Sequence, residues 1–127
     1  MRRSLRLALL LSVLGATAAA SAPAVAAPAP PRVIAIELQS EINPVSAAFV
    51  KDSIAKATDE HAAALVILLD TPGGLSTSMD DIVQAELGSK VPVIVYVSPE
   101  GARAASAGVF VTMAADVAAM APTTNIG

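Results

Sequence analysis

The sequence contains no cysteine, a single histidine and only three aromatic residues in 127 positions. Without cysteine the chain cannot form a disulfide, a thiolate metal site or a cysteine nucleophile. His61 alone cannot build a histidine-based metal cage, and three aromatic rings are too few for stacking on single-stranded nucleic acid. The net charge of −3 provides no basic surface. We therefore expect no metal, no other cofactor and no nucleic-acid partner.

Acidic residues are missing from the start of the chain, where the first carboxylate is Glu37. Three arginines among residues 2–6 precede an apolar run over residues 7–20, and small residues follow at 24–26. This pattern is typical of a secretory signal peptide. The run is shorter than the ~20 apolar residues that a membrane-spanning helix needs, so a retained N-terminal anchor is the less favoured alternative. We expect residues 1–26 to be a signal peptide and the mature chain to act outside the cytoplasm.

Prolines dominate residues 27–31, which we interpret as a stiff leader because proline cannot continue a helix. The folded domain is then expected to occupy residues 32–127. Three apolar runs rich in β-branched residues, 33–38, 65–69 and 91–97, have the length of strands. Their continuous apolar character is typical of parallel strands that are buried on both faces.

Helical patterns separate these runs. Asn43 followed by Pro44 predicts the start of a first helix that ends near His61. Ser78 with Asp81 three residues later is a capping-box pattern and predicts the start of a second helix. Strands alternating with helices at this spacing indicate an α/β fold, with a mainly parallel sheet built from right-handed βαβ units.

The last part of the chain continues this pattern and then changes. Residues 102–115 are predicted as a helix of small residues, and residues 117–120 as a fourth short strand. Residues 123–127 look like a loop, with no helix or strand to close the domain. We therefore expect the domain to be incomplete at its C-terminus.

Ligands of open parallel sheets bind beyond the carboxyl ends of the strands, which directs attention to two loops. After the strand 65–69 comes Asp-Thr-Pro-Gly-Gly, in which Gly73 and Gly74 leave backbone N–H groups open to a substrate carbonyl. The alternative for this glycine pair is an ordinary tight turn.

The second loop carries Ser106 among small residues, on the expected turn into a helix. The sequence Ala-Ala-Ser-Ala-Gly resembles the G-x-S-x-G nucleophile elbow with alanine at the first glycine. A packing or helix-capping serine is the alternative. Because the two loops follow neighbouring strands, their combination favours a nucleophilic site at one edge of the sheet.

No general base for Ser106 is found in this sequence. His61 and Lys90 both come just before predicted strands, and so belong at the opposite edge of the sheet. Lys51 and Lys56 are expected on the outer face of the first helix. The acidic residues are scattered over helix faces and first turns, so they predict no metal site.

Three motifs occur together in the order found in one family: Leu-Asp-Thr-Pro-Gly-Gly at 69–74, Ala-Ser-Ala-Gly at 105–108 and Thr-Asn-Ile-Gly at 124–127. Over residues 32–127 the sequence resembles the protease domain of NfeD-type, membrane-bound Clp-class serine proteases. The resemblance implies a Clp/crotonase-like fold, endopeptidase activity on apolar peptide segments, and a Ser–Lys dyad in place of a Ser-His-Asp triad.

The resemblance also implies roles for individual residues. Ser106 takes the position of the nucleophile, and the backbone N–H groups of Gly74 and Ala107 take those of the oxyanion hole. Gly73 supports the turn and pairs with the substrate backbone. The general-base lysine of the family lies beyond position 127, so residues 1–127 are expected to be inactive by themselves and to form the N-terminal part of the protease domain.

Partners and location are likewise implied by the resemblance. The expected substrate is a peptide or a membrane protein, and the expected partner is a stomatin-like membrane protein. The chain is expected to assemble as a homo-oligomer and to associate with the membrane, with the protease domain outside the cytoplasm. Two other functions remain open. One is a non-catalytic binding or assembly module with the same membrane partner. The other is a crotonase-like enzyme in which the glycine pair polarises the thioester of an acyl-coenzyme A.

Overall fold

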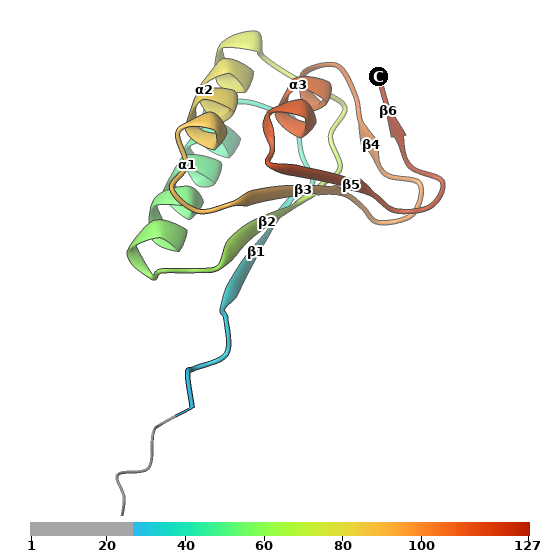
Figure 1. Ribbon diagram of the computed structural model, residues 1–127. Coiled ribbons are helices and arrows are strands. Elements are labelled where there is room, and N and C mark those ends of the chain that lie inside the picture. The colour runs from blue at the N-terminus through green and yellow to red at the C-terminus, as the bar shows by residue number, and fades with distance from the viewer. Residues whose placement is uncertain (1–26) are drawn as a thin grey trace, which may run out of the picture.

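A computed structural model describes residues 27–127 (Figure 1). The expected signal peptide, residues 1–26, lies outside the described residues. Residues 27–32 form neither helix nor strand and lead into the first strand of the domain. None of the helices in the described part of the chain is both long and apolar enough to cross a membrane.

Four parallel strands form the central sheet, in the order β1-β2-β3-β5. They span Val33–Leu38 (β1), Ala64–Leu69 (β2), Val93–Val97 (β3) and Val117–Met120 (β5). Neighbouring strands pair in parallel, as right-handed crossovers between consecutive strands require. The prediction of a mainly parallel α/β sheet is therefore confirmed, with the third strand beginning two residues later than expected.

Three helices pack on the same face of this sheet (Figure 1). They span Pro44–Asp59 (α1), Ser76–Leu87 (α2) and Ala107–Ala114 (α3). The buried core lies between helices and sheet, and in β1 burial alternates between the two faces. Burial of every strand on both faces, which the continuous apolar runs predicted, is therefore wrong for the part of the chain that the structure describes.

Asn43 caps α1 as its sequence predicts. Its side-chain Oδ1 accepts hydrogen bonds from the backbone N–H groups of Val45 at 2.9 Å and Ser46 at 3.0 Å. The capping is reciprocal, because the Ser46 Oγ accepts a hydrogen bond from the Asn43 N–H at 2.9 Å. Pro44 occupies the first helical position, where a missing N–H costs nothing. These bonds fix the direction in which the chain leaves the carboxyl edge of β1.

The second helix starts earlier than the capping-box pattern predicts. It begins at Ser76, and Leu75 precedes it without offering a side-chain cap. Ser78 is buried inside the helix, so its predicted capping role is wrong. The Leu75 N–H donates to the Ile42 carbonyl at 2.8 Å, and the Leu75 carbonyl accepts from the Met79 N–H at 3.0 Å. Long-range pairing with Ile42 therefore sets the start of α2.

The region after β3 also differs from the predicted helix over residues 102–115. Arg103–Ala104 form a short strand, β4, which pairs in parallel with Asn125–Ile126, β6. Helix α3 begins only at Ala107. Residues 123–127 thus contain a strand, and their expected loop character is wrong. Two-residue strands have no periodicity that a sequence pattern could reveal, because their hydrogen bonds join distant segments.

Glu86 is an acidic residue in the buried face of α2. Glu86 follows Ser78 and Ile82 at four-residue spacing, which places all three residues on one side of the helix. The residue is 3% exposed, and neither carboxylate oxygen has a hydrogen-bond partner among the described residues. Burial, and secondarily the negative charge of Asp116, raises the pKa of Glu86 to about 8. The carboxyl is therefore neutral at pH 7 in the folded protein.

This buried carboxyl predicts a specific dependence of stability on pH. The unfolded chain releases the Glu86 proton near 4.5, whereas the folded chain holds it to about 8. The free energy of unfolding should therefore fall as pH rises through this window, by about 1.4 kcal/mol per pH unit. Glu86→Gln should remove the decrease, raising the melting temperature at pH 8 and leaving it nearly unchanged at pH 4.

Thermal unfolding followed by circular dichroism across this pH range tests the expectation. Glu37→Gln, at an exposed position on β1, is the matched control and should leave the pH dependence as it is. An equal pH dependence in wild type and Glu86→Gln would show that Glu86 is not the responsible group.

Candidate active site

The two loops predicted to form a site meet at the carboxyl edge of the sheet. Gly73 lies directly against Ser106: a Cβ added to Gly73 would come within 2.7 Å of the Ser106 Cβ and 3.2 Å of its Oγ. Gly73 also has a φ of 106°, a backbone conformation that residues other than glycine rarely adopt. Glycine is therefore needed at this position both for the turn and for the close approach of the serine.

Ser106 has a backbone conformation that is rare for a residue with a side chain. Its φ is 52° and its ψ −114°, at the sharp turn from β4 into α3. The residue is exposed, and its hydroxyl does not cap the helix. A capping or packing role, the alternative left open by the sequence, therefore does not describe this serine. The geometry matches the strained strand-to-helix turn of a nucleophile elbow.

Backbone hydrogen bonds hold this turn from the C-terminal side. The Ser106 N–H donates to the Gly127 carbonyl at 3.2 Å, and the Gly127 N–H donates to the Ala104 carbonyl at 3.1 Å. The Thr-Asn-Ile-Gly segment is thus part of the support of the elbow, because β6 runs beside β4. Such support is needed where a strained conformation must persist.

Gly74 packs against Ile42, a contact that the sequence interpretation missed. A Cβ on Gly74 would collide with the backbone of Ile42, chiefly its carbonyl oxygen. The Ile42 N–H donates to the Gly73 carbonyl at 2.8 Å, so the two segments pair as a short parallel bridge. Ile42 is fully buried, and its place just before the Asn43 cap is the position of a hydrophobic staple, which is the signal that could have found it.

Two backbone N–H groups are free at the residues that follow Gly73 and Ser106 in the chain. Within residues 27–127, neither Gly74 nor Ala107 donates its N–H to a backbone or side-chain acceptor. Ala107 is the first residue of α3, where N–H groups have no intrahelical partner and the helix dipole is positive. Free donors next to an exposed hydroxyl form a set that can stabilise a developing oxyanion.

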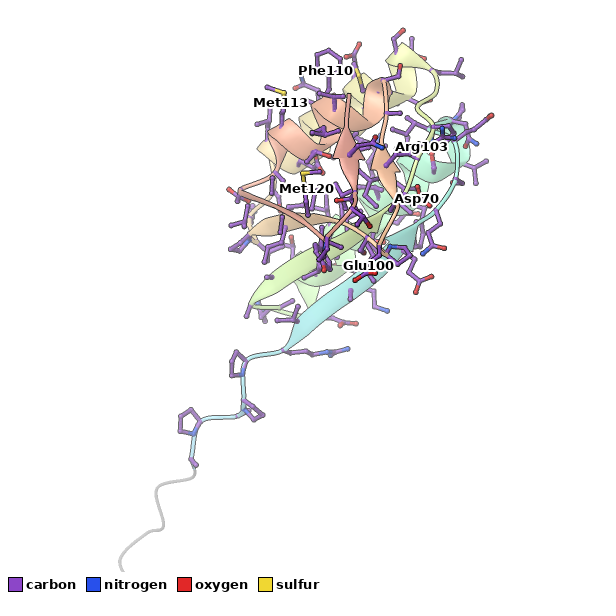
Figure 2. All side chains as sticks on the ribbon, turned by 90° about the vertical axis from the view of Figure 1, so that its right-hand side faces the viewer. Asp70, Glu100, Arg103, Phe110, Met113 and Met120 are labelled. Carbon is purple, nitrogen blue, oxygen red and sulfur yellow. The ribbon has the colours of Figure 1, made fainter. Side chains whose placement is uncertain are left out.

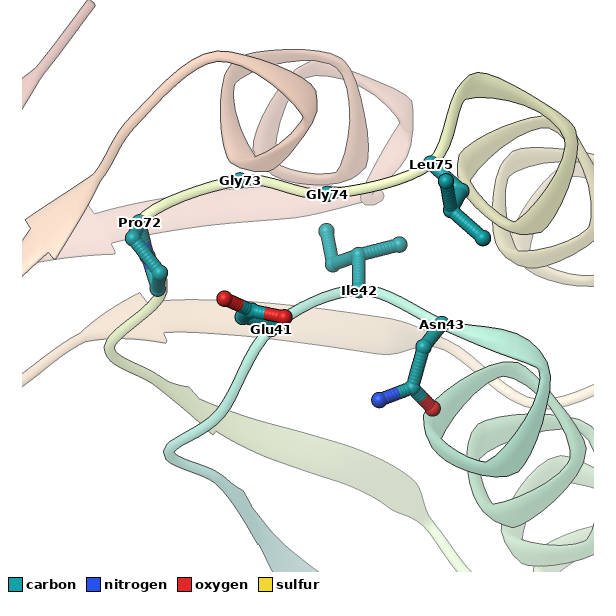
Figure 3. A pocket seen from close by; sticks show the side chains of 7 residues that line it. All are labelled: Glu41, Ile42, Asn43, Pro72, Gly73, Gly74 and Leu75. Carbon is teal, nitrogen blue, oxygen red and sulfur yellow. The ribbon is translucent and has the colours of Figure 1, made fainter.

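A hollow of about 350 Å³ adjoins the glycine pair (Figure 3). Residues from the loop after β1 form one wall, and the loop after β2 forms the other; together they are Glu41, Ile42, Asn43, Pro72, Gly73, Gly74 and Leu75. Glu41 and Pro72 lie close to each other at one end, whereas Leu75 and Asn43 lie at the other (Figure 3). The hollow gives a bound chain room beside the glycine backbone.

No basic side chain of the described residues is placed to act as a base for Ser106. His61 and Lys90 line a separate depression near the amino ends of β2 and β3, as the sequence predicts. Lys51 and Lys56 are exposed on α1. Within residues 27–127 no group of three or more histidine, aspartate or glutamate side chains could hold a metal ion. The described residues thus present an exposed serine and free hydrogen-bond donors, but no partner base.

The chain is similar in sequence to known proteins. Residues 32–127 match the family of the NfeD1b N-terminal domain. The membrane-bound protease PH1510 of Pyrococcus horikoshii is 51% identical over 71 residues, which are 56% of this chain and 16% of that protein. The membrane protein NfeD1b of Bacillus subtilis is 34% identical over 95 residues, 75% of this chain and 21% of that protein. The chain therefore spans about a fifth or less of these relatives.

Solved structures share its fold. A serine-to-alanine mutant of the 1510-N membrane-bound stomatin-specific protease superposes with a TM-score of 0.76 at 39% identity, covering 78% of this chain and 48% of that one. A lysine-to-alanine mutant of the same protease in complex with a substrate peptide gives 0.75 at 40% identity, with 76% and 44% covered. ClpP1 of Listeria monocytogenes, at 22% identity and a TM-score of 0.63 over 71% of this chain and 52% of that one, is similar in fold. The predicted Clp/crotonase-like fold is confirmed.

The packing of Gly74 on Ile42 predicts a large cost for a single added methyl group. Gly74→Ala forces the backbone of Ile42 to move and should lower the free energy of unfolding by about 1–3 kcal/mol or more. Gly101→Ala is the matched control: its φ is 79°, but no atom lies within 4 Å of the added methyl group. Chemical denaturation of both variants measures the difference. A Gly101→Ala variant as unstable as Gly74→Ala would contradict the packing argument.

Proposed function

The chain belongs to the NfeD1b N-terminal domain family, and on that premise we propose that residues 32–127 are the nucleophile-bearing part of a Clp-class serine protease domain. The observation that carries the proposal is the strained, exposed Ser106 in contact with Gly73. Backbone strain at an exposed residue that does not cap a helix is typical of catalytic positions. The full-length protein is then a membrane-associated serine endopeptidase.

In the proposed reaction the Ser106 Oγ attacks the carbonyl carbon of the scissile peptide bond, while its proton passes to a general base. The carbonyl oxygen becomes an oxyanion, which the N–H groups of Gly74 and Ala107 stabilise. Collapse of this intermediate breaks the C–N bond, and the leaving amine takes the proton from the base. Water then hydrolyses the acyl-enzyme by the same steps. Gly73 supports the turn in this reaction; its N–H and its carbonyl are already bonded to Thr71 and Ile42, so it does not pair with the backbone of the substrate as the family resemblance implied.

The base that we propose is a lysine outside residues 27–127. None of the three lysines in this range lies at the site, and one of the similar solved structures is a lysine-to-alanine mutant with a bound substrate peptide. Desolvation in an apolar pocket lowers the pKa of a lysine enough for it to accept a proton near neutral pH. A Ser–Lys dyad therefore completes the chemistry in the full-length protein.

The substrates that we propose are apolar peptide segments, with a stomatin-like membrane protein as partner. The 1510-N protease, to which this chain is similar, is described as stomatin-specific. Apolar side chains are exposed near the nucleophile helix: Phe110 by 56%, Met113 by 73% and Met120 by 43%. In Figure 2 they lie to the left, on α3 and β5, with Asp70 and Arg103 to the right. An apolar chain would cover this surface.

The proposal extends to location and assembly. We place the protease domain outside the cytoplasm, following removal of a signal peptide at residues 1–26, and in a homo-oligomer at the membrane. The basic start and apolar run of the first residues support export. The relatives that the chain matches are membrane proteins.

Substitution of the nucleophile is the direct test of the proposed function. Ser106→Ala in the full-length gene product should lower cleavage of an apolar peptide at least about 10³-fold, because the acyl-enzyme can no longer form. Ser40→Ala, an exposed serine after β1, is the control and should cleave normally. Unchanged cleavage by Ser106→Ala would refute the assignment. An acyl-coenzyme A hydrolase activity that survives the substitution would favour the crotonase-like alternative.

Residues 1–127 alone should show no hydrolysis, because they lack the proposed lysine. Incubation of this polypeptide with the same peptide, followed by mass spectrometry, measures the activity against the full-length protein. Cleavage that disappears in the Ser106→Ala polypeptide would mean that a base lies within these residues and would contradict the proposed dyad.

A further inference from the structure

Thr71 is a polar residue at 0% exposure between the glycine loop and the serine turn. It is the second residue after β2 and precedes Pro72 and the glycine pair. The sequence interpretation gave it no role. Because a buried hydroxyl costs free energy unless it is hydrogen-bonded, the partners of this side chain indicate what it is there to hold.

The hydroxyl of Thr71 bonds to both polar backbone atoms of Gly73. Its Oγ1 accepts from the Gly73 N–H at 3.1 Å and donates to the Gly73 carbonyl at 3.3 Å. The same carbonyl also accepts from the Ile42 N–H at 2.8 Å. Two donors therefore fix the direction of the Gly73 carbonyl, in a segment where neighbouring glycines would otherwise rotate freely.

The direction of this carbonyl determines where the Gly74 N–H points. Both groups belong to the planar trans peptide bond between Gly73 and Gly74, so they point to opposite sides of the chain. Holding the Gly73 oxygen on the Ile42 and Thr71 side turns the Gly74 N–H away from it. The free N–H assigned to the oxyanion is thus aimed by bonds to the other end of the same peptide unit.

The remaining atoms of Thr71 contact the nucleophile turn. Its N–H donates to the Arg103 carbonyl at 2.8 Å, and its carbonyl accepts from the Ala105 N–H at 3.1 Å. Its methyl group packs on Gly108 in the first turn of α3, where an added Cβ would lie 2.6 Å from it. One residue therefore contacts both halves of the site, with its hydroxyl on one and its backbone and methyl group on the other.

Building on the proposed function, we propose that Thr71 is a positioning residue that fixes the Gly74 N–H relative to Ser106 through its hydroxyl. The hydroxyl itself touches no substrate. Its effect falls on the transition state, because an oxyanion donor that is turned away costs little in substrate binding and much in the rate of acylation.

Two substitutions separate the hydroxyl from the methyl group in the full-length protein. Thr71→Val keeps the shape and loses the hydroxyl, whereas Thr71→Ser keeps the hydroxyl and loses the methyl group. The control is Thr112→Val, which removes another buried hydroxyl, one whose hydrogen bond goes to the Gly108 carbonyl at 2.8 Å and not to Gly73 or Gly74.

Thr71→Val should lower kcat for the apolar peptide about 10- to 100-fold and leave KM nearly unchanged. Hydrogen–deuterium exchange of the Gly73 amide should become about tenfold faster in this variant, because the Gly73 N–H loses its acceptor. Thr71→Ser should keep kcat and the exchange rate within about twofold of wild type, even where its melting temperature falls. Thr112→Val should also leave kcat and the exchange rate within about twofold of wild type.

The exchange measurement separates this proposal from the proposed function. Should Ser106→Ala retain cleavage, the proposed function fails, and exchange of the Gly73 amide still reports whether the hydroxyl holds the Gly73 peptide. Normal exchange and kcat in Thr71→Val would overturn the positioning role. A loss of kcat of tenfold or more in Thr71→Ser would overturn it as well, whether or not Thr71→Val folds, because the hydroxyl is then present and insufficient.

Discussion

The contact between Gly73 and Ser106 is the constraint on which the rest of the site depends. The serine side chain occupies the space that a Cβ at position 73 would need, at 2.7 Å. Because there is no room for a side chain between the two loops, a shift of either loop would change this contact, and each loop is anchored separately. The loop with the glycines is tied to Ile42, and the turn with the serine is tied to Thr71 and Gly127. Backbone hydrogen bonds provide nearly all of this anchoring.

The parallel sheet makes the contact possible. Strands β2 and β3 are neighbours and run in the same direction, so the chain leaves both at one edge. The helices pack on a single face, which brings α3 and its first turn over the loop after β2 (Figure 1). The fold also contains a costly feature in its interior, the buried carboxyl of Glu86, which has no hydrogen-bond partner among the described residues. Strain at Ser106 and the burial of Glu86 both depend on the surrounding core for their persistence.

Much of this arrangement could be predicted from the sequence. The apolar runs identified the strands of the sheet, and Asn43 with Pro44 marked the start of α1, because these signals are local. The glycine pair and Ser106 were found for the same reason. Strands β4 and β6 could not be predicted, since two-residue strands are defined by partners far away along the chain. The backbone contacts of Ile42 with Gly73 and of Thr71 with Arg103 were missed because they join segments far apart in the sequence. The start of α2 was misplaced because pairing with Ile42 overrides the pattern at Ser78.

In the proposed mechanism, Ser106 attacks a peptide carbonyl, and the backbone N–H groups of Gly74 and Ala107 bind the resulting oxyanion. A crystal structure of the full-length protein with a peptide boronic acid tests this most directly, since boron forms a tetrahedral adduct that resembles the intermediate. We predict a bond from boron to the Ser106 Oγ, with one boronate oxygen about 2.7–3.1 Å from the backbone nitrogens of Gly74 and Ala107. An adduct on another residue, or a boronate oxygen that faces away from both nitrogens, would contradict the account.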